Sequence, residues 1–373
     1  MNRPTSPSTR SNGGERPGRS SSGTRFSRCQ LFLIRLGLVI GTPVIFLVVV
    51  EFALRMATTG SFYLTEKNPH FLGRDGTVRL VPNTRTWWYG QDYQINSNGF
   101  RMTHEVGPKH GLRILGLGDS VTVGMGVTRT GDVWPNWLET IAHQRGLTNL
   151  DVINSGVQGW NLLIANKTNV IPAEYTRFVE EVAPKLEPDL IVYCVSLNDV
   201  PSVIDDTFVM DNARNRARFK LFPESAREWF KRKAFYRLAR DGYREARFHK
   251  LDFSPLLTVP ESDSFWAQVA EELGRLKRAT ESLHAKLCCV IVPYSYQLLP
   301  ANKKLLDVNQ RWHRALEQNH IPWVDLTSSF NETTVLDYYA LGDYCHLNTK
   351  GHHLIAEEAF NLIQDELRQH GSP

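Results

Sequence analysis

The chain is 373 residues long, 42% hydrophobic and 22% charged, with five Cys and a formal net charge of +4. These proportions exclude a mainly disordered chain, a collagen-like chain and a disulfide-stapled scaffold, and the length allows one large domain with extensions or two average domains. Residues 1–28 carry a net charge of +5 and residues 211–250 a net charge of +8, which leaves the rest of the chain at −9. A mildly acidic body with two basic attachments argues against diffuse nucleic-acid binding.

None of the five Cys forms a C-x-x-C pair, and the sequence has no H-E-x-x-H motif or other zinc-ligand spacing. Cys194, Cys288 and Cys289 lie in apolar runs, so we interpret them as buried free thiols. We therefore expect no metal ion and no cofactor.

A polar tail and an apolar run begin the chain. Residues 1–28 are rich in Ser, Gly, Pro and Arg without apolar periodicity, which predicts a disordered basic tail. Residues 31–54 contain only two charged side chains, Arg35 and Glu51, near the two ends. As a helix this run would extend ~36 Å, enough to cross a hydrocarbon core of ~30 Å. We predict a transmembrane helix over residues 29–54.

A buried core helix and a cleaved signal peptide are the alternatives for this run. The long Arg-rich leader and the missing A-x-A cleavage site argue against a signal peptide. Arg residues crowd the N-terminal flank, and the positive-inside rule then places the N-terminus in the cytoplasm and the remaining chain outside it, in a single-pass topology.

The next segments predict a β-rich lead-in and an α/β domain. Residues 55–110 hold short β-prone runs separated by Gly, Asn and Pro. In residues 111–370, apolar strands alternate with helical patterns, which predicts a parallel sheet with helices on both faces and a ligand site at the carboxyl ends of the strands. The expected strands are 113–117, 150–154, 190–195, 286–292 and 321–326, and the expected helices are 134–145, 161–183, 264–285, 302–319 and 349–368.

Residues 201–262 interrupt the strand–helix alternation and are too long for a simple connection, which indicates an insertion. Its aromatic and apolar residues are interleaved with Arg and Lys. It could lie on an anionic membrane surface, grip an acidic polysaccharide or phosphorylated substrate, or form a solvated helix that covers the site. The apolar residues are Phe230, Phe235, Tyr236 and Leu238.

Polar motifs follow three of the predicted strands. Ser120 ends the motif Gly118-Asp119-Ser120. Its hydroxyl and its own N–H would face the edge of the sheet, as a nucleophile with an oxyanion donor requires. The alternative is that Asp119 or Ser120 only caps a helix. Gly156 could offer an unhindered N–H, or simply form a turn. Asn198 could offer an amide donor, or form an Asx turn.

Asp343 and His346 precede the last predicted helix. His346 could act as general base to Ser120, and Asp343, three residues earlier, could accept from its other ring nitrogen. Alone, such a D-x-x-H pair most often lies on a protein surface without a catalytic role.

Together these four blocks, in this order, resemble the SGNH/GDSL hydrolase family over roughly residues 112–368. The resemblance implies a flavodoxin-like three-layer αβα sandwich with a five-stranded parallel sheet. It implies Ser120 as nucleophile, His346 as base, Asp343 as its orienting partner, and an oxyanion hole formed by Ser120, Gly156 and Asn198. The usual Gly two residues before the Asn is Ser196 here. The segment INSNGFRM is also similar to the lead-in of membrane-attached members of the family.

These features predict a membrane-anchored serine esterase. Tyr294 and Tyr296 follow the fourth strand and are candidates for substrate binding, or packing aromatics. An extracytoplasmic location favours O-acetylated carbohydrate as the substrate, whereas the anchor and the basic insertion would also fit lipid esters. The alternatives are an O-acetyltransferase that uses the same triad and a non-catalytic glycan-binding module. We expect no nucleic-acid partner, and the sequence leaves the oligomeric state open.

Overall fold

The computed structural model describes residues 27–59, 67–73, 76–88, 90–165, 170–172, 174–199, 223, 225, 229–230, 233–247, 262–299, 306–330 and 334–371. The predicted disordered tail and most of the predicted insertion therefore lie outside the described residues. The chain divides into two units, residues 1–49 and 50–373.

Helix α1 (Arg28–Thr59) is a single 32-residue helix that contains Pro43. Its residues 28–57 are long and apolar enough to cross a membrane, and none of their most apolar stretch is buried within the protein. A helix that is apolar around its whole circumference needs an apolar environment. Signal sequences share these properties of length and composition.

The lead-in contains two antiparallel strand pairs, as expected for a β-rich segment. Strand β1 (His70–Leu72) pairs with β2 (Val78–Leu80), and β3 (Thr84–Trp88) pairs with β4 (Gln91–Ile95). Tyr93 and Ile95 are buried and pack with Val123, which belongs to the following α/β domain. The lead-in therefore shares a hydrophobic cluster with that domain.

Five parallel strands form the central sheet in the order β11-β10-β9-β5-β6. Read from the other edge and numbered along the chain, this order is 2-1-3-4-5, the flavodoxin-like arrangement. The fold predicted from the sequence is confirmed. The strands are β5 (Leu112–Gly118), β6 (Leu150–Asn154), β9 (Leu190–Val195), β10 (Lys286–Ile291) and β11 (Trp323–Asp325).

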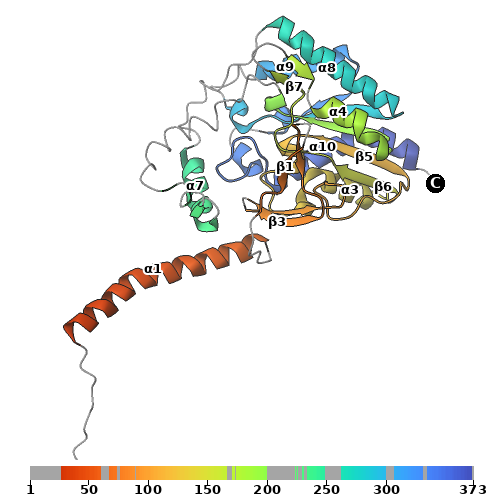
Figure 1. The fold of residues 1–373 in the computed structure, drawn as a ribbon. Helices are drawn as coiled ribbons and strands as arrows, with labels where there is room; N and C mark the ends of the chain where they lie inside the picture. Colours follow the sequence, from red (N-terminus) through yellow and green to blue (C-terminus); the bar gives the residue numbers. More distant parts are fainter. Residues whose placement is uncertain are drawn as a thin grey trace, which may run out of the picture. The chain divides into compact units, whose positions relative to one another are not determined.

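Helices cover both faces of the sheet and make two hydrophobic cores (Figure 1). On one face Ile191 and Tyr193 pack with side chains of α4 (Glu174–Glu181), α8 (Asp263–Ser282) and α9 (Leu306–Gln318). On the other, Val192 and Cys194 pack with α3 (Trp134–Gln144) and α10 (Thr349–Gly371). The alternation follows from the two-residue period of a strand, which sends successive side chains to opposite faces. Cys194, Cys288 and Cys289 are buried free thiols in these cores, as expected.

The single helix predicted over residues 161–183 is wrong. The structure has strands β7 (Leu163–Ala165) and β8 (Val170–Pro172), which form an antiparallel pair, and α4 begins only at Glu174. Val170 and Ile171 are β-branched and precede Pro172, and a residue before proline is pushed out of the helical region. The apolar spacing of this segment therefore belongs to a strand pair followed by a short helix.

The described part of the insertion includes one long helix, α7 (Ala234–Arg247). Leu238 and Tyr243 are exposed, at 51% and 60%, whereas Arg237 is buried and Arg244 and Glu245 are half-buried. The charged residues of α7 whose burial is described are buried or partly buried, whereas the exposed ones described on this helix, which include Leu238 and Tyr243, are uncharged.

Candidate active site

The turn after β5 places Ser120 at the carboxyl edge of the sheet. Strand β5 ends at Gly118, and the short helix α2 (Ser120–Val123) begins two residues later. Asp119 caps this helix, because its Oδ1 accepts from Val121 N at 2.9 Å. A side chain at position 118 could not fit, since a Cβ there would lie 2.2 Å from Thr122 Oγ1. The capping role foreseen as an alternative thus falls to Asp119, and Ser120 is the first residue of the helix.

Strand register brings the other motifs beside Ser120. Gly118 on β5 pairs with Cys194 on β9, and Gly116 pairs with Asn154 on β6. Strand β5 therefore lies between the two strands that lead to Gly156 and Asn198. The connection after β5 runs to β6 and the connection after β9 runs to β10, in opposite directions along the sheet, and a crevice forms at such a switch point in open α/β sheets.

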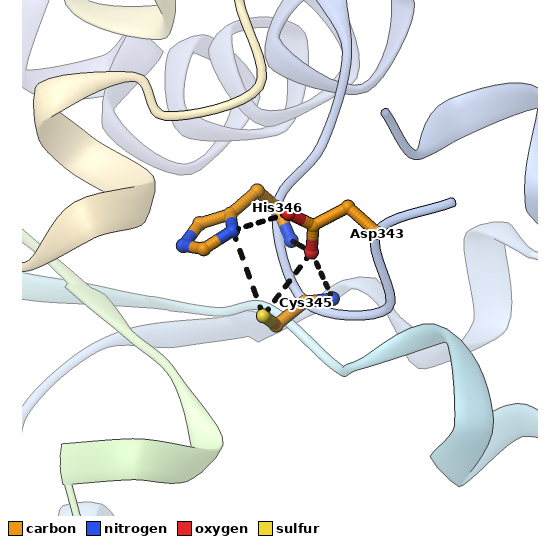
Figure 2. Close-up of side chains that lie close together, drawn as sticks. All are labelled: Asp343, Cys345 and His346. Carbon is orange, nitrogen blue, oxygen red and sulfur yellow. Dashed lines mark hydrogen bonds and ion pairs between the residues drawn. The ribbon is translucent and has the colours of Figure 1, made fainter. Parts of the chain in front are cut away.

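Ser120, His346 and Asp343 form one hydrogen-bonded chain. His346 Nε2 lies 3.0 Å from Ser120 Oγ, and His346 Nδ1 lies 2.8 Å from Asp343 Oδ2. Figure 2 shows the Asp343 carboxylate on one side of the imidazole ring, with the second ring nitrogen directed away from it. Asp343 Oδ1 also accepts from the backbone N–H groups of Cys345 and His346, at 3.0 and 3.1 Å. These bonds fix the carboxylate and hence the ring that it orients.

The electrostatics of this chain favour a carboxylate–imidazolium pair. Burial by itself would lower the pKa of His346, but the Asp343 carboxylate and the Cys345 side chain together outweigh burial and hold that pKa well above its usual value. Burial would raise the pKa of Asp343, but His346 and the backbone hydrogen bonds hold it well below its usual value. An imidazole stabilised in its protonated form is suited to accept a proton from a serine hydroxyl.

The N–H groups of Ser120 and Gly156 are two of the three oxyanion-hole donors expected from the sequence. The N–H of Ser120 belongs to the first residue of α2, where a helix offers no internal acceptor. Gly156 packs so tightly on α2 that a Cβ would lie 2.3 Å from Val123 N, and only glycine permits this approach. The Gly156 N–H donates to Asn154 Oδ1 at 3.1 Å in this structure, so an oxyanion would have to share it.

Asn198 lies in a short 3-10 helix (Leu197–Asp199) and is tied into a side-chain network. Its Nδ2 donates to Asp119 Oδ2 at 2.6 Å, while its Oδ1 accepts from Tyr294 Oη at 2.8 Å and from the Ser196 hydroxyl. One N–H of the amide is therefore engaged by Asp119.

Tyr294 and Tyr296 are buried, with 5% and 1% of their surfaces exposed. Their rings meet edge to face with centroids 5.7 Å apart. The Tyr294 hydroxyl reaches the site through Asn198. A direct substrate contact by either tyrosine stays a prediction from the sequence.

Asp199 is a site residue that the sequence reasoning missed. It is fully buried, and its Oδ2 accepts from Ser196 N at 2.8 Å while its Oδ1 accepts from Tyr175 Oη at 2.9 Å. Burial, and then the nearby Asp119, raise the pKa of Asp199 well above its usual value. Asp199 thus holds the backbone turn that presents Asn198. The signal available in the sequence was a charged residue four positions after the end of an otherwise apolar strand.

Arg101, from the lead-in, is a second missed residue. It is fully buried, and its guanidinium donates to four backbone carbonyl oxygens. Nη1 reaches the oxygens of Val123 and Gly124 at 3.0 and 2.7 Å, and Nη2 reaches those of Asp92 and Val127 at 2.8 and 3.1 Å. Arg101 therefore fixes the loop that follows the Ser120 helix.

Helix α7 contacts the turn that carries Asp343. Glu245 accepts from the N–H of Gly342 at 2.9 Å, and the Arg244 guanidinium lies 5.2 Å from the centre of the Tyr344 ring. Gly342 has a φ of +66°, and a Cβ there would lie 2.4 Å from the carbonyl oxygen of Asp241. The approach of α7 therefore requires glycine at this position, one residue before Asp343.

Two clusters of potential ligand atoms occur among the described residues. The first cluster consists of Asp343, Cys345 and His346. Burial, and next the Asp343 carboxylate, raise the pKa of the Cys345 thiol in this cluster to about 11. A protonated thiol is a poor metal ligand, and Asp343 and His346 already bond each other, so this cluster does not suit a cation. The second cluster, His104, Glu139 and Asp151, is partly exposed, and Asp151 forms an ion pair with Arg113 at 2.8 Å.

Residues 117–354 match the GDSL-like Lipase/Acylhydrolase family, a stretch that includes Ser120, Gly156, Asn198 and the Asp343–His346 pair. No curated protein matches the sequence.

The solved structures that this chain is similar to include TesA, a two-domain esterase and a carbohydrate acetylesterase family member. A structure of TesA is 12% identical, covering 68% of this chain and 98% of that chain, with a TM-score of 0.40. A two-domain esterase active on acetylated mannans is 14% identical, covering 71% of this chain and 52% of that chain, also with a TM-score of 0.40. A carbohydrate acetylesterase family member from Sinorhizobium meliloti is 13% identical, covering 69% of this chain and 99% of that chain, with a TM-score of 0.40.

Proposed function

Because the chain belongs to the GDSL-like Lipase/Acylhydrolase family and is a hydrolase that acts on ester bonds, we propose that it is a membrane-anchored serine esterase with Ser120 as its nucleophile. The observation that carries the proposal is the continuous chain from Ser120 Oγ through His346 to Asp343, at 3.0 and 2.8 Å.

In the proposed mechanism, Ser120 Oγ attacks the ester carbonyl carbon while His346 Nε2 takes the hydroxyl proton. The carbonyl oxygen becomes an oxyanion that the N–H groups of Ser120 and Gly156 and the Asn198 amide would stabilise. His346 then returns the proton to the leaving alcohol as the C–O bond breaks, which leaves an acyl-Ser120 intermediate. Water, deprotonated by His346, attacks this intermediate and releases the carboxylic acid and the free serine.

We propose O-acetylated carbohydrate as the substrate class and α1 as the anchor. The support is the length and apolar composition of α1 together with the Arg-rich sequence before it, which would place the catalytic unit outside the cytoplasm. Membrane association that resists alkaline carbonate, with a catalytic unit that protease reaches from the outer side, would support this topology. A soluble product whose N-terminus begins after α1 would show a signal sequence instead.

The testing experiment uses the full chain in detergent micelles and p-nitrophenyl esters of increasing acyl length. We expect turnover of short acyl chains that is abolished in Ser120→Ala and retained in Ser282→Ala, a change at an exposed serine. A long-chain optimum would redirect the substrate class to lipids. Acetyl transfer to added oligosaccharide without release of acetate would identify a transferase, and no reaction of folded protein with any ester or acceptor would refute the proposal.

A further inference from the structure

Of the three oxyanion donors proposed above, Asn198 is the only one supplied by a side chain. The Ser120 and Gly156 N–H groups are held by the backbone, whereas a carboxamide can turn about its terminal torsion, which is broad and has no single strong minimum. An oxyanion donor acts only when it is oriented before the charge develops. Something must therefore hold the Asn198 amide with its nitrogen toward the site.

The contacts of Asn198 define which way its amide faces. Nδ2 lies 2.6 Å from Asp119 Oδ2, and a carboxylate oxygen accepts hydrogen bonds, so the nitrogen must be on that side. Oδ1 faces the opposite way, toward two hydroxyl groups. Tyr294 Oη donates to it at 2.8 Å, and the Ser196 hydroxyl also lies in hydrogen-bond contact.

Tyr294 is built to hold its hydroxyl in place. The side chain is 5% exposed, and its ring packs against that of Tyr296. Its backbone N–H donates to Gln297 Oε1 at 2.6 Å, at the start of a short 3-10 helix (Ser295–Leu298). Burial raises the pKa of Tyr294 well above its usual value, so the hydroxyl keeps its proton and remains a donor.

Ser196 supplies the second hydroxyl where the resemblance leads one to expect glycine. Its Oγ lies in contact with Asn198 Oδ1 and 3.1 Å from Asp119 Oδ2. A hydroxyl has one proton, so it donates to one of these oxygens at a time and links the two side chains. Ser196 is also fixed through its backbone, because its N–H donates to the buried Asp199.

We propose that Tyr294 is a positioning residue, assisted by Ser196, that orients the Asn198 carboxamide so that its nitrogen serves the oxyanion hole. The inference rests on the proposed function of Asn198. Tyr294 acts through Asn198 and touches no reacting atom, which differs from the direct substrate contact predicted from the sequence. If the Tyr294 hydroxyl is removed, Oδ1 loses a rigid donor and the amide samples orientations that weaken transition-state binding but not substrate binding.

A double-mutant cycle on the full chain in micelles, assayed with p-nitrophenyl acetate, tests this. Tyr294→Phe should lower kcat by roughly 3- to 10-fold, the size of one net hydrogen bond, with KM within about twofold of wild type. Asn198→Ala should lower kcat by about 100- to 1,000-fold. The double variant should be no slower than Asn198→Ala, because Tyr294 acts only through Asn198.

Tyr338→Phe is the control, since it removes the hydroxyl of another tyrosine, one that is partly buried and whose ring packs on Phe330, and it should keep wild-type kcat. The inference would be overturned if Tyr294→Phe lowered kcat equally in the Asn198→Ala background. It would also be overturned if Tyr294→Phe changed only KM, or changed neither constant. A crystal structure of Tyr294→Phe with the amide unmoved and well ordered would do the same without any activity measurement. An inactive wild type would instead count against the proposed function.

Discussion

At the residue scale, His346 lies between the carboxylate of Asp343 and the hydroxyl of Ser120. Burial disfavours the charged imidazole, but the adjacent Asp343 carboxylate and the Cys345 side chain together outweigh burial, so the pKa of His346 is raised. Histidine is ordinarily half-protonated near pH 6.5. A general base must be neutral to accept the serine proton, so kcat/KM of the wild type should rise with pH through a midpoint above ~6.5.

Asp343→Asn removes the group that raises this pKa and leaves burial, which lowers it. We expect the His346 pKa and the acid limb of kcat/KM to move to lower pH, and the plateau rate to fall by about 10⁴-fold because the ring loses its orienting acceptor. NMR titration of the imidazole signals with the pH–rate profile measures both effects. Asp263→Asn, at a fully exposed side chain, should change neither. If kcat/KM of Asp343→Asn rose with pH through the same midpoint as that of the wild type, this account would be contradicted.

At the scale of elements, the catalytic turn is held by a helix from outside the regular α/β alternation. Helix α7 directs Glu245 and Arg244 toward Gly342 and Tyr344, on the turn that carries Asp343. The exposed residues described on this helix, which include Leu238 and Tyr243, are uncharged. Because the Gly342 N–H bonds to a carboxylate, this contact is stronger than one to a neutral acceptor. Helix α7 therefore helps to hold the turn that carries Asp343.

Glu245→Ala should loosen that turn and lower kcat by roughly tenfold, because a charge-assisted hydrogen bond is lost and small displacements of catalytic groups reduce rates strongly. Glu245→Gln keeps an acceptor oxygen and should retain most of the activity. Steady-state kinetics on the full chain compares both with Leu238→Ala, a change on the exposed face of α7, which should resemble wild type. Equal rates for Glu245→Ala and wild type would show that α7 does not support the turn.

At the scale of the catalytic unit, the lead-in and the α/β domain are joined by a buried cation. Arg101 donates to carbonyl oxygens of Asp92, Val123, Gly124 and Val127, so the segment before the sheet determines the loop after the Ser120 helix. A buried guanidinium is stable only when its donors are satisfied, and here the backbone satisfies them. The lead-in is thus integral to the site.

Arg101→Ala should lower the free energy of unfolding by at least on the order of 3 kcal/mol, because several buried carbonyl oxygens lose their donor. Urea unfolding of the full chain followed by near-UV circular dichroism measures the change. Arg85→Ala, at a guanidinium that is 56% exposed and pairs with Asp92 on the surface, should cost less than about 1 kcal/mol. Equal losses in the two variants would refute the role of Arg101.

The sequence by itself determined the sheet and the place of the site. Strands β6 and β9 begin and end where the apolar runs do, because strand periodicity and burial are local properties. Since parallel strands end at one edge, the motifs after β5, β6 and β9 had to meet there. The helix expected over residues 161–183 failed because Pro172 and its β-branched neighbours outweigh an apolar spacing that is compatible with either structure.

Only the tertiary structure decided how the site is held. Tyr294 and Asn198 are 96 residues apart, Glu245 and Gly342 are 97 apart, and Arg101 reaches a carbonyl oxygen 22 residues ahead. No local pattern encodes such pairs, because a hydrogen bond depends on where two distant segments come to rest in the folded chain. The chemistry of the groups could be read from residue types in order, whereas their orientation is set by contacts that exist only once the sheet, the lead-in and α7 have packed together.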